Sequence, residues 1–186
     1  MIQGLRGRIL ARETFALAKW EIMNGIILFA HGSLLCGAGQ ALLEHTERLR
    51  NRGLALVVEV GYLNYSEPPF LEAVKRCVGQ GVTEIIVTPY FLVPGKFVRV
   101  DLPQAVAEAQ ERFPQIAFRV AEAIGYEERL AEALIQSAKQ GKPPEEWGSD
   151  VEQATAFCRP SEVCPLYQTP LCPKAPGERD PQEGVL

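Results

Sequence analysis

Residues 25–33 read Gly-Ile-Ile-Leu-Phe-Ala-His-Gly-Ser, an apolar run that ends abruptly on His31. A short run that is apolar at successive positions is typical of a strand buried on both faces of a parallel sheet. Such a strand places His31 at its carboxyl end, where open α/β sheets bind their ligands. The chain has two histidines, so we expect this one to be functional; the alternative is a histidine that only bonds a loop carbonyl.

Strand-like and helix-like segments alternate after this run. The expected strands span 25–31, 54–62, 82–91 and 116–122, and the expected helices span 37–52, 67–80, 100–113 and 126–140. Gly53 would end the first helix, and Ser66 would cap the start of the second. This alternation predicts a three-layer, flavodoxin-like α/β fold with a mainly parallel four-stranded sheet flanked by helices.

The pattern divides the chain into three parts. Residues 1–23 are expected to be an N-terminal extension, 24–140 the α/β domain, and 141–186 a tail rich in proline that holds three cysteines. The tail lacks the long periodicity of a second domain.

Composition excludes several function classes. The net charge is −4 over 186 residues and no basic stripe is present, so we expect no nucleic-acid partner. We expect no membrane partner, because no apolar stretch approaches the roughly 18–20 residues that span a bilayer. Arg6, Arg8 and Arg12 interrupt the start of the chain, which argues against a secretory signal. We therefore expect a cytoplasmic protein whose cysteines are thiols.

A second segment, residues 87–103, leaves the third expected strand at the same edge of the sheet as His31. It carries positive charge at Lys96 and Arg99, and flat apolar side chains at Tyr90, Phe91 and Phe97. Such a rim suits a large, planar, anionic ligand. The alternative is an ordinary loop with solvated cations.

Two further positions are candidates for the site. Ser33 follows Gly32 and can satisfy backbone donors of the next helix or contact a substrate. Glu59 lies inside an apolar strand, where a carboxylate is costly unless it is paired or functional. It is either a metal ligand near the strand's end or a residue at a solvated sheet edge.

Three segments together resemble the small sirohydrochlorin chelatases: Ile-Ile-Leu-Phe-Ala-His-Gly-Ser, the stretch from Glu59 to Pro68, and the loop from Pro89 to Pro103. The resemblance covers about residues 24–140. It implies a class II chelatase fold and the insertion of Co²⁺ or Fe²⁺ into sirohydrochlorin, without ATP, in cobalamin or sirohaem biosynthesis. It also implies a homodimer, and it matches His31 to the family's first metal ligand.

One position departs from the family pattern. The loop of these chelatases usually reads Gly-X-His, and that histidine is the second metal ligand; here the position is Phe97. Either one histidine is enough, another group substitutes, or the activity differs. His31 would then serve as base and transient ligand, while Lys96 and Arg99 pair with the carboxylates of the macrocycle.

The cysteines and the second histidine complete the candidates. Cys36 lies just before the first expected helix and could approach the metal in place of the missing histidine, whereas Cys77 is expected in the core. His45 falls on one helical stripe with Ala38, Leu42 and Leu49 and is expected to be a packed or boundary residue. The tail cysteines are Cys158, Cys164 and Cys172.

Some longer chelatases of this type carry an iron–sulfur centre near the C-terminus. The tail cysteines could therefore hold a cluster or a zinc ion, although the tail offers no fourth Cys or His; the alternative is a tail with free thiols.

Two other functions compete with metal insertion. A non-catalytic tetrapyrrole- or metal-binding protein would keep the fold but lose insertion with Phe97. An unrelated flavodoxin-like binding module is disfavoured, because no phosphate-binding glycine loop follows the first strand.

Overall fold

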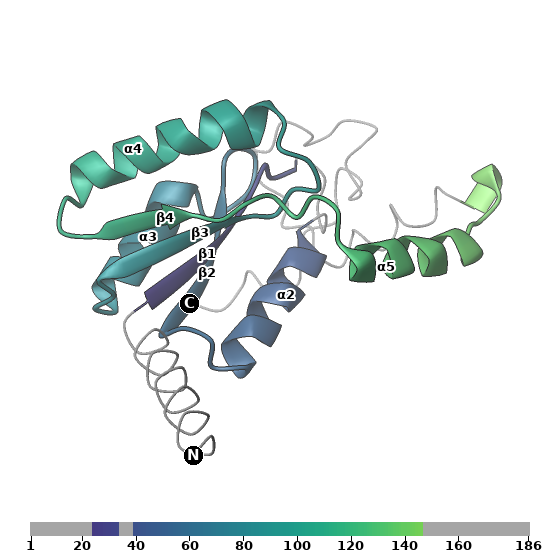
Figure 1. The fold of residues 1–186 in the computed structure, drawn as a ribbon, viewed down its shortest axis with the longest axis horizontal. Helices are drawn as coiled ribbons and strands as arrows, with labels where there is room; N and C mark the ends of the chain where they lie inside the picture. The colour runs from purple at the N-terminus through teal and green to yellow at the C-terminus, as the bar shows by residue number, and fades with distance from the viewer. Residues whose placement is uncertain (1–23, 34–38, 147–186) are drawn as a thin grey trace, which may run out of the picture.

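The computed structural model describes residues 24–33 and 39–146, so the N-terminal extension and almost the whole tail lie outside the described residues. Its strands are β1 (Asn24–Ala30), β2 (Val57–Tyr62), β3 (Glu84–Pro89) and β4 (Ala117–Val120). They form one sheet in the order β2-β1-β3-β4, and every neighbouring pair is parallel. The expected four-stranded parallel sheet is confirmed (Figure 1).

The helices are α2 (Gln40–Asn51), α3 (Phe70–Gly79), α4 (Leu102–Arg112) and α5 (Glu128–Lys139), with a 3₁₀ turn over Pro144–Glu146. A π-helical turn, η1 (Phe97–Asp101), leads directly into α4. The expectation that Ser66 caps α3 is wrong. Two prolines delay the start of this helix, and Pro69 stands at its N-cap position.

The larger core lies between the sheet and the two helices α3 and α4. Ile27 and Phe29 of β1 point into it and are fully buried, as are Val87 of β3 and Leu102 of α4. Cys77 of α3 is buried there too, as expected. Burial, together with the negative charge of Glu59, raises the pKa of the Cys77 thiol to about 12, so this thiol stays protonated and unreactive near neutral pH.

The opposite face of the sheet is only half covered. Helix α2 packs on β1 and β2 through Leu42, and the buried cluster there contains no residue of β3 or β4. On this face Ile86 of β3 is half-buried and Arg119 of β4 is exposed. Helix α5 has no buried residue and extends away from the sheet (Figure 1). Within the described part of the chain, no helix covers the β3–β4 half of this face.

The strand order creates a crevice at the end of β1. The chain passes from β1 to β2 on one side and then crosses to β3 on the other side. The loops after β2 and β3 therefore flank the carboxyl end of β1 from opposite sides, which is where ligands bind in such sheets. Among the described helices, none is long and apolar enough to cross a membrane.

Candidate functional site

His31 follows directly after β1 and is half-buried at the crevice. Its Nδ1 lies 3.2 Å from the carbonyl oxygen of Gly32. This contact is a hydrogen bond when Nδ1 carries the proton, and in that tautomer Nε2 presents a lone pair. The imidazole can then accept a proton or bind a metal ion through Nε2.

Two turns packed together fix the backbone of His31. Gly32 has a φ of +86°, and a side chain there would collide with the carbonyl oxygen of Asn64, so the position requires glycine. The Asn64 N–H donates to the His31 carbonyl at 2.9 Å. The Ser33 N–H donates to Ser66 Oγ at 3.0 Å, and this hydroxyl donates to the Ser33 carbonyl at 3.3 Å.

The hydroxyl of Ser66 thus has a different partner from the helix start that the sequence predicts. Its hydroxyl holds the turn that follows β1 and does not cap α3. A serine just before a helix that starts with prolines is typical of a helix cap. No local pattern indicates that its hydroxyl binds Ser33, which lies 33 positions away.

Two aromatic rings contact the imidazole of His31. The Phe97 ring lies 4.3 Å away between centroids, at an interplanar angle of 39°. The Tyr65 ring lies 5.5 Å away, at 69°. Phe97 also contacts Phe91 at 6.0 Å. The structure thus brings Phe97 to His31, as the sequence predicted, and adds Tyr65, which sequence reasoning missed.

A cavity of about 280 Å³ opens beside His31, between the end of β1 and the start of α2. Ser33, Ser66, Tyr62, Tyr90 and Phe91 contribute to its walls. Burial raises the pKa of Tyr62, so its phenol stays neutral near pH 7. The lining is largely apolar, and its polar side-chain groups are the imidazole of His31 and several hydroxyl groups.

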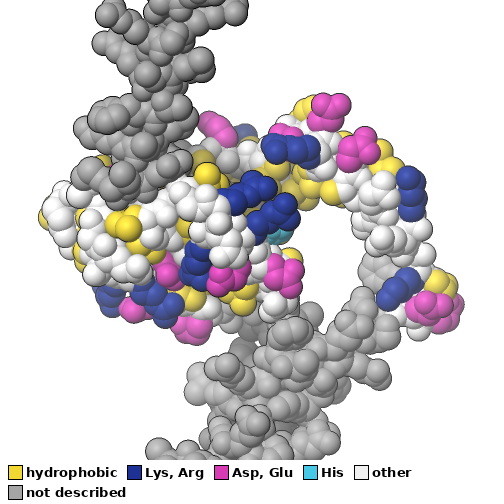
Figure 2. All heavy atoms as spheres, turned by 90° about the horizontal axis from the view of Figure 1, so that it is seen from below, with side chains coloured by type: hydrophobic (Ala, Val, Ile, Leu, Met, Phe, Trp, Pro, Cys, Tyr) yellow, Lys and Arg dark blue, Asp and Glu magenta, His cyan; other side chains and the backbone are white. Residues whose placement is uncertain are grey.

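Lys96 and Arg99 lie on the same loop as Phe97. Lys96 Nζ pairs with Asp101 Oδ1 at 2.6 Å, while the Lys96 side chain remains 71% exposed. Arg99 is exposed within the π-helical turn. Figure 2 shows Lys and Arg side chains gathered beside a histidine on one face of the molecule.

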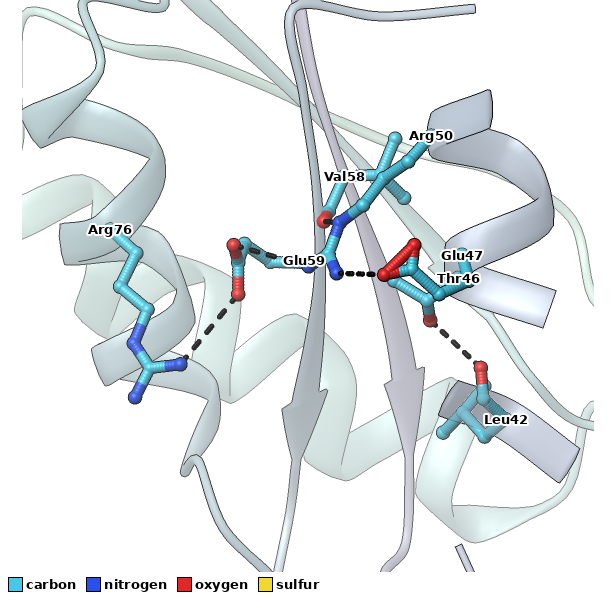
Figure 3. Close-up of polar contacts among 7 residues, drawn as sticks. All are labelled: Leu42, Thr46, Glu47, Arg50, Val58, Glu59 and Arg76. Atoms are coloured by element: carbon cyan, nitrogen blue, oxygen red, sulfur yellow. Dashed lines mark hydrogen bonds and ion pairs between the residues drawn. The ribbon is translucent and has the colours of Figure 1, made fainter. Parts of the chain in front are cut away.

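Glu59 is not brought to His31. It lies beside Ile27 in the sheet, in the middle of the edge strand β2. Its carboxylate pairs with Arg50 of α2 at 3.4 Å and with Arg76 of α3 at 3.8 Å, as Figure 3 shows. Of the two interpretations of Glu59, the geometry supports the paired residue at a sheet edge, where it ties helices from both faces to β2.

The expectation that His45 is a packed or boundary residue is wrong. His45 is exposed on α2, and its ring contacts Tyr90 at a centroid distance of 5.8 Å. Thr46 takes the buried position and donates from Oγ1 to the Leu42 carbonyl at 2.8 Å.

The remaining candidate cysteines, Cys36, Cys158, Cys164 and Cys172, lie outside the described residues. Over residues 24–33 and 39–146, no group of three or more His, Cys, Asp or Glu side chains is placed to hold a metal ion. His31 with its two aromatic neighbours is the centre of the candidate site.

Comparison with known proteins gives consistent matches. The CbiX family model matches residues 25–141. A sirohydrochlorin cobaltochelatase of Methanococcus maripaludis is 33% identical over 82 residues, covering 44% of this chain and 57% of that protein. The enzyme of the same name from Methanocaldococcus jannaschii is 37% identical over 82 residues, with the same two coverages. The chain thus spans just over half the length of these curated relatives.

Among solved structures, the sirohydrochlorin chelatase SirB of Bacillus subtilis subspecies spizizenii, in complex with cobalt, superposes with a TM-score of 0.60 at 26% identity. The match covers 73% of this chain and 59% of that one. This likeness agrees with a three-layer α/β fold built on a parallel sheet.

Proposed function

The chain belongs to the CbiX family, and from that premise we propose that it inserts a divalent metal ion, Co²⁺ or Fe²⁺, into sirohydrochlorin. The reaction would serve cobalamin or sirohaem biosynthesis in the cytoplasm and would need no ATP. The named relatives are sirohydrochlorin cobaltochelatases and a sirohydrochlorin chelatase seen with cobalt. The observation that carries the proposal is a single imidazole at the crevice, held by two interlocked turns beside a cavity.

His31 would act in both parts of the reaction. Metal insertion removes two protons from pyrrole nitrogens and passes a divalent ion into the ring. With Nδ1 directed at the Gly32 carbonyl, Nε2 would first hold the ion and, once the ion has passed to the ring, take one of the two protons, while the other proton passes to water. A site with one imidazole binds the ion weakly, which favours its release into the macrocycle.

The loop after β3 would bind the macrocycle. Lys96 and Arg99 supply cations for the carboxylates of sirohydrochlorin, and Phe97 supplies a flat surface beside His31. Asp101 holds one hydrogen of the Lys96 ammonium, and the other two remain available for substrate. Ser33 contributes by fixing the turn after His31 and by lining the cavity.

A homodimer would cover the apolar surfaces that one copy leaves exposed. Helix α5 presents Leu134 and Ile135 to solvent, 57% and 48% exposed, while half of one sheet face has no described helix over it. An amphipathic helix and a sheet half that no described helix covers are both places where layered folds bury apolar area. We assign α5 of one copy to contact with the other copy.

The test is an insertion assay with purified full-length protein, sirohydrochlorin and Co²⁺ or Fe²⁺, followed by absorbance. His31→Ala should abolish the protein-dependent rate and leave the melting temperature unchanged, because His31 fills no core position. His45→Ala is the matched control, since it removes the chain's other imidazole from an exposed helix position. Near-normal turnover of the His31 variant would rule out the one-histidine mechanism.

The second candidate is a non-catalytic tetrapyrrole- or metal-binding protein. The observation that favours it is Phe97, whose phenyl ring stands against His31 where the family's second imidazole is expected. Wild-type protein that binds sirohydrochlorin but does not accelerate insertion of either metal would establish this alternative.

A further inference from the structure

Tyr65 has a backbone conformation that L-amino acids rarely adopt. Its φ is +60°, and among the described residues it alone combines a side chain with a positive φ. Glycine or asparagine is the usual residue at such a position, and a bulky residue there is an outlier that often marks a functional site. A tyrosine at such a position therefore calls for a reason beyond the shape of the turn.

Core packing does not explain this tyrosine, because the residue is 62% exposed. Its ring instead lies 5.5 Å from the imidazole of His31, nearly edge-on at 69°. An exposed aromatic ring beside a candidate base and metal ligand is a binding surface.

The turn that carries Tyr65 is rigidly tied to the turn that carries His31. The Leu63 and Asn64 N–H groups donate to the carbonyls of Ala30 and His31, both at 2.9 Å. Ser66 closes the turn with a 2.7 Å bond from its N–H to the Asn64 carbonyl, and its hydroxyl binds Ser33. The backbone that carries the phenol ring is therefore held in a fixed place relative to the backbone of His31 before any substrate binds.

Topology places a second ring on the other side of His31. Tyr65 lies on the loop after β2 and Phe97 lies in the turn after β3, and these two strands flank β1. The imidazole thus stands between two exposed aromatic side chains that reach it from neighbouring strands. The rings of Tyr65 and Phe97 offer flat apolar surfaces on either side of the imidazole. This arrangement suits a planar macrocycle whose central nitrogens must lie over Nε2 of His31.

Resting on the proposed function, we propose that Tyr65 is a positioning residue whose ring packs on the tetrapyrrole and sets the pyrrole nitrogens over His31. The ring, not the hydroxyl, supplies the contact. The strained turn keeps the ring at the crevice instead of letting it fold onto the sheet.

The test measures sirohydrochlorin binding without metal, by absorbance titration of the full-length protein. Tyr65→Ala should weaken binding about ten-fold, the range of a lost aromatic stacking contact. Tyr65→Phe should stay within about two-fold of wild type, because it keeps the ring. In the insertion assay, Tyr65→Ala should raise KM by a similar factor and should also lower kcat, because the pyrrole nitrogens are no longer held over His31.

Two controls separate the ring from the backbone. Tyr65→Gly relieves the strain and also removes the ring, so it should bind as weakly as the alanine variant. Wild-type affinity for the glycine variant would overturn the proposal, since the effect of alanine would then come from the turn. Leu56→Ala removes a comparably exposed apolar side chain just before β2, at the end of the strand away from Tyr65. This variant should bind sirohydrochlorin as tightly as the wild type.

The outcomes for the two proposals are distinct. Wild-type protein that fails to bind sirohydrochlorin would overturn the proposed function together with this role of Tyr65. Wild-type protein that binds, with an alanine variant that binds equally well, would overturn the role of Tyr65 alone.

Discussion

The ring that faces His31 sets how tightly the site can hold a metal ion. Phe97 contacts the imidazole at 4.3 Å and cannot coordinate a cation. Phe97→His should therefore raise the resting affinity for Co²⁺ by about ten-fold or more, because two imidazoles bind this ion better than one. Isothermal titration calorimetry with Co²⁺ measures the change.

Phe97→Leu is the control for this substitution, since it removes the ring without adding a ligand and should give no gain in affinity. An unchanged Co²⁺ affinity for Phe97→His would mean that residue 97 does not reach the ion. The correspondence between this loop and the Gly-X-His loop of the family would then fail.

Among the secondary-structure elements, β2 is joined to two helices by one carboxylate in addition to apolar packing. The Glu59 side chain is only 14% exposed, and it pairs with arginines of α2 and α3. Glu59→Gln keeps the shape but loses the charge, so unfolding in urea should show a loss of about 1–2 kcal/mol. Co²⁺ affinity should not change, and a parallel loss of affinity would return Glu59 to the candidate metal ligands.

The elements themselves could be predicted because their signals are local. The apolar run predicts the bounds of β1 to within one residue. The rule that parallel strands end at the same edge of a sheet predicts that Phe97 lies near His31, as it does. The errors concern partners far along the chain. Ser66 was assigned to its own helix and binds Ser33 instead. The two interpretations of Glu59 stayed open because no local pattern says that β2 is an edge strand.

For the whole molecule, the exposed α5 predicts that assembly depends on its apolar side. Leu134→Glu combined with Ile135→Glu should convert a dimer into a monomer in sedimentation velocity, because two charges would enter an apolar contact. Gln136→Glu adds charge to the same helix at a polar position and should leave the dimer intact. A wild-type protein that is monomeric at all concentrations would contradict the assignment of α5 to the interface.

The π-helical turn over Phe97–Asp101 has a consequence for how this site can evolve. A π turn holds one residue more than an α turn, so loss of a single codon within it can restore α-helical geometry without breaking the chain path. Each residue of an α-helix is offset by about 100° from the next, so the deletion would rotate a different side chain toward the imidazole. The group that faces His31 can therefore be exchanged by deletion as well as by point mutation. Single-codon deletions scored for Co²⁺ binding should yield altered affinity in this turn more often than in α4.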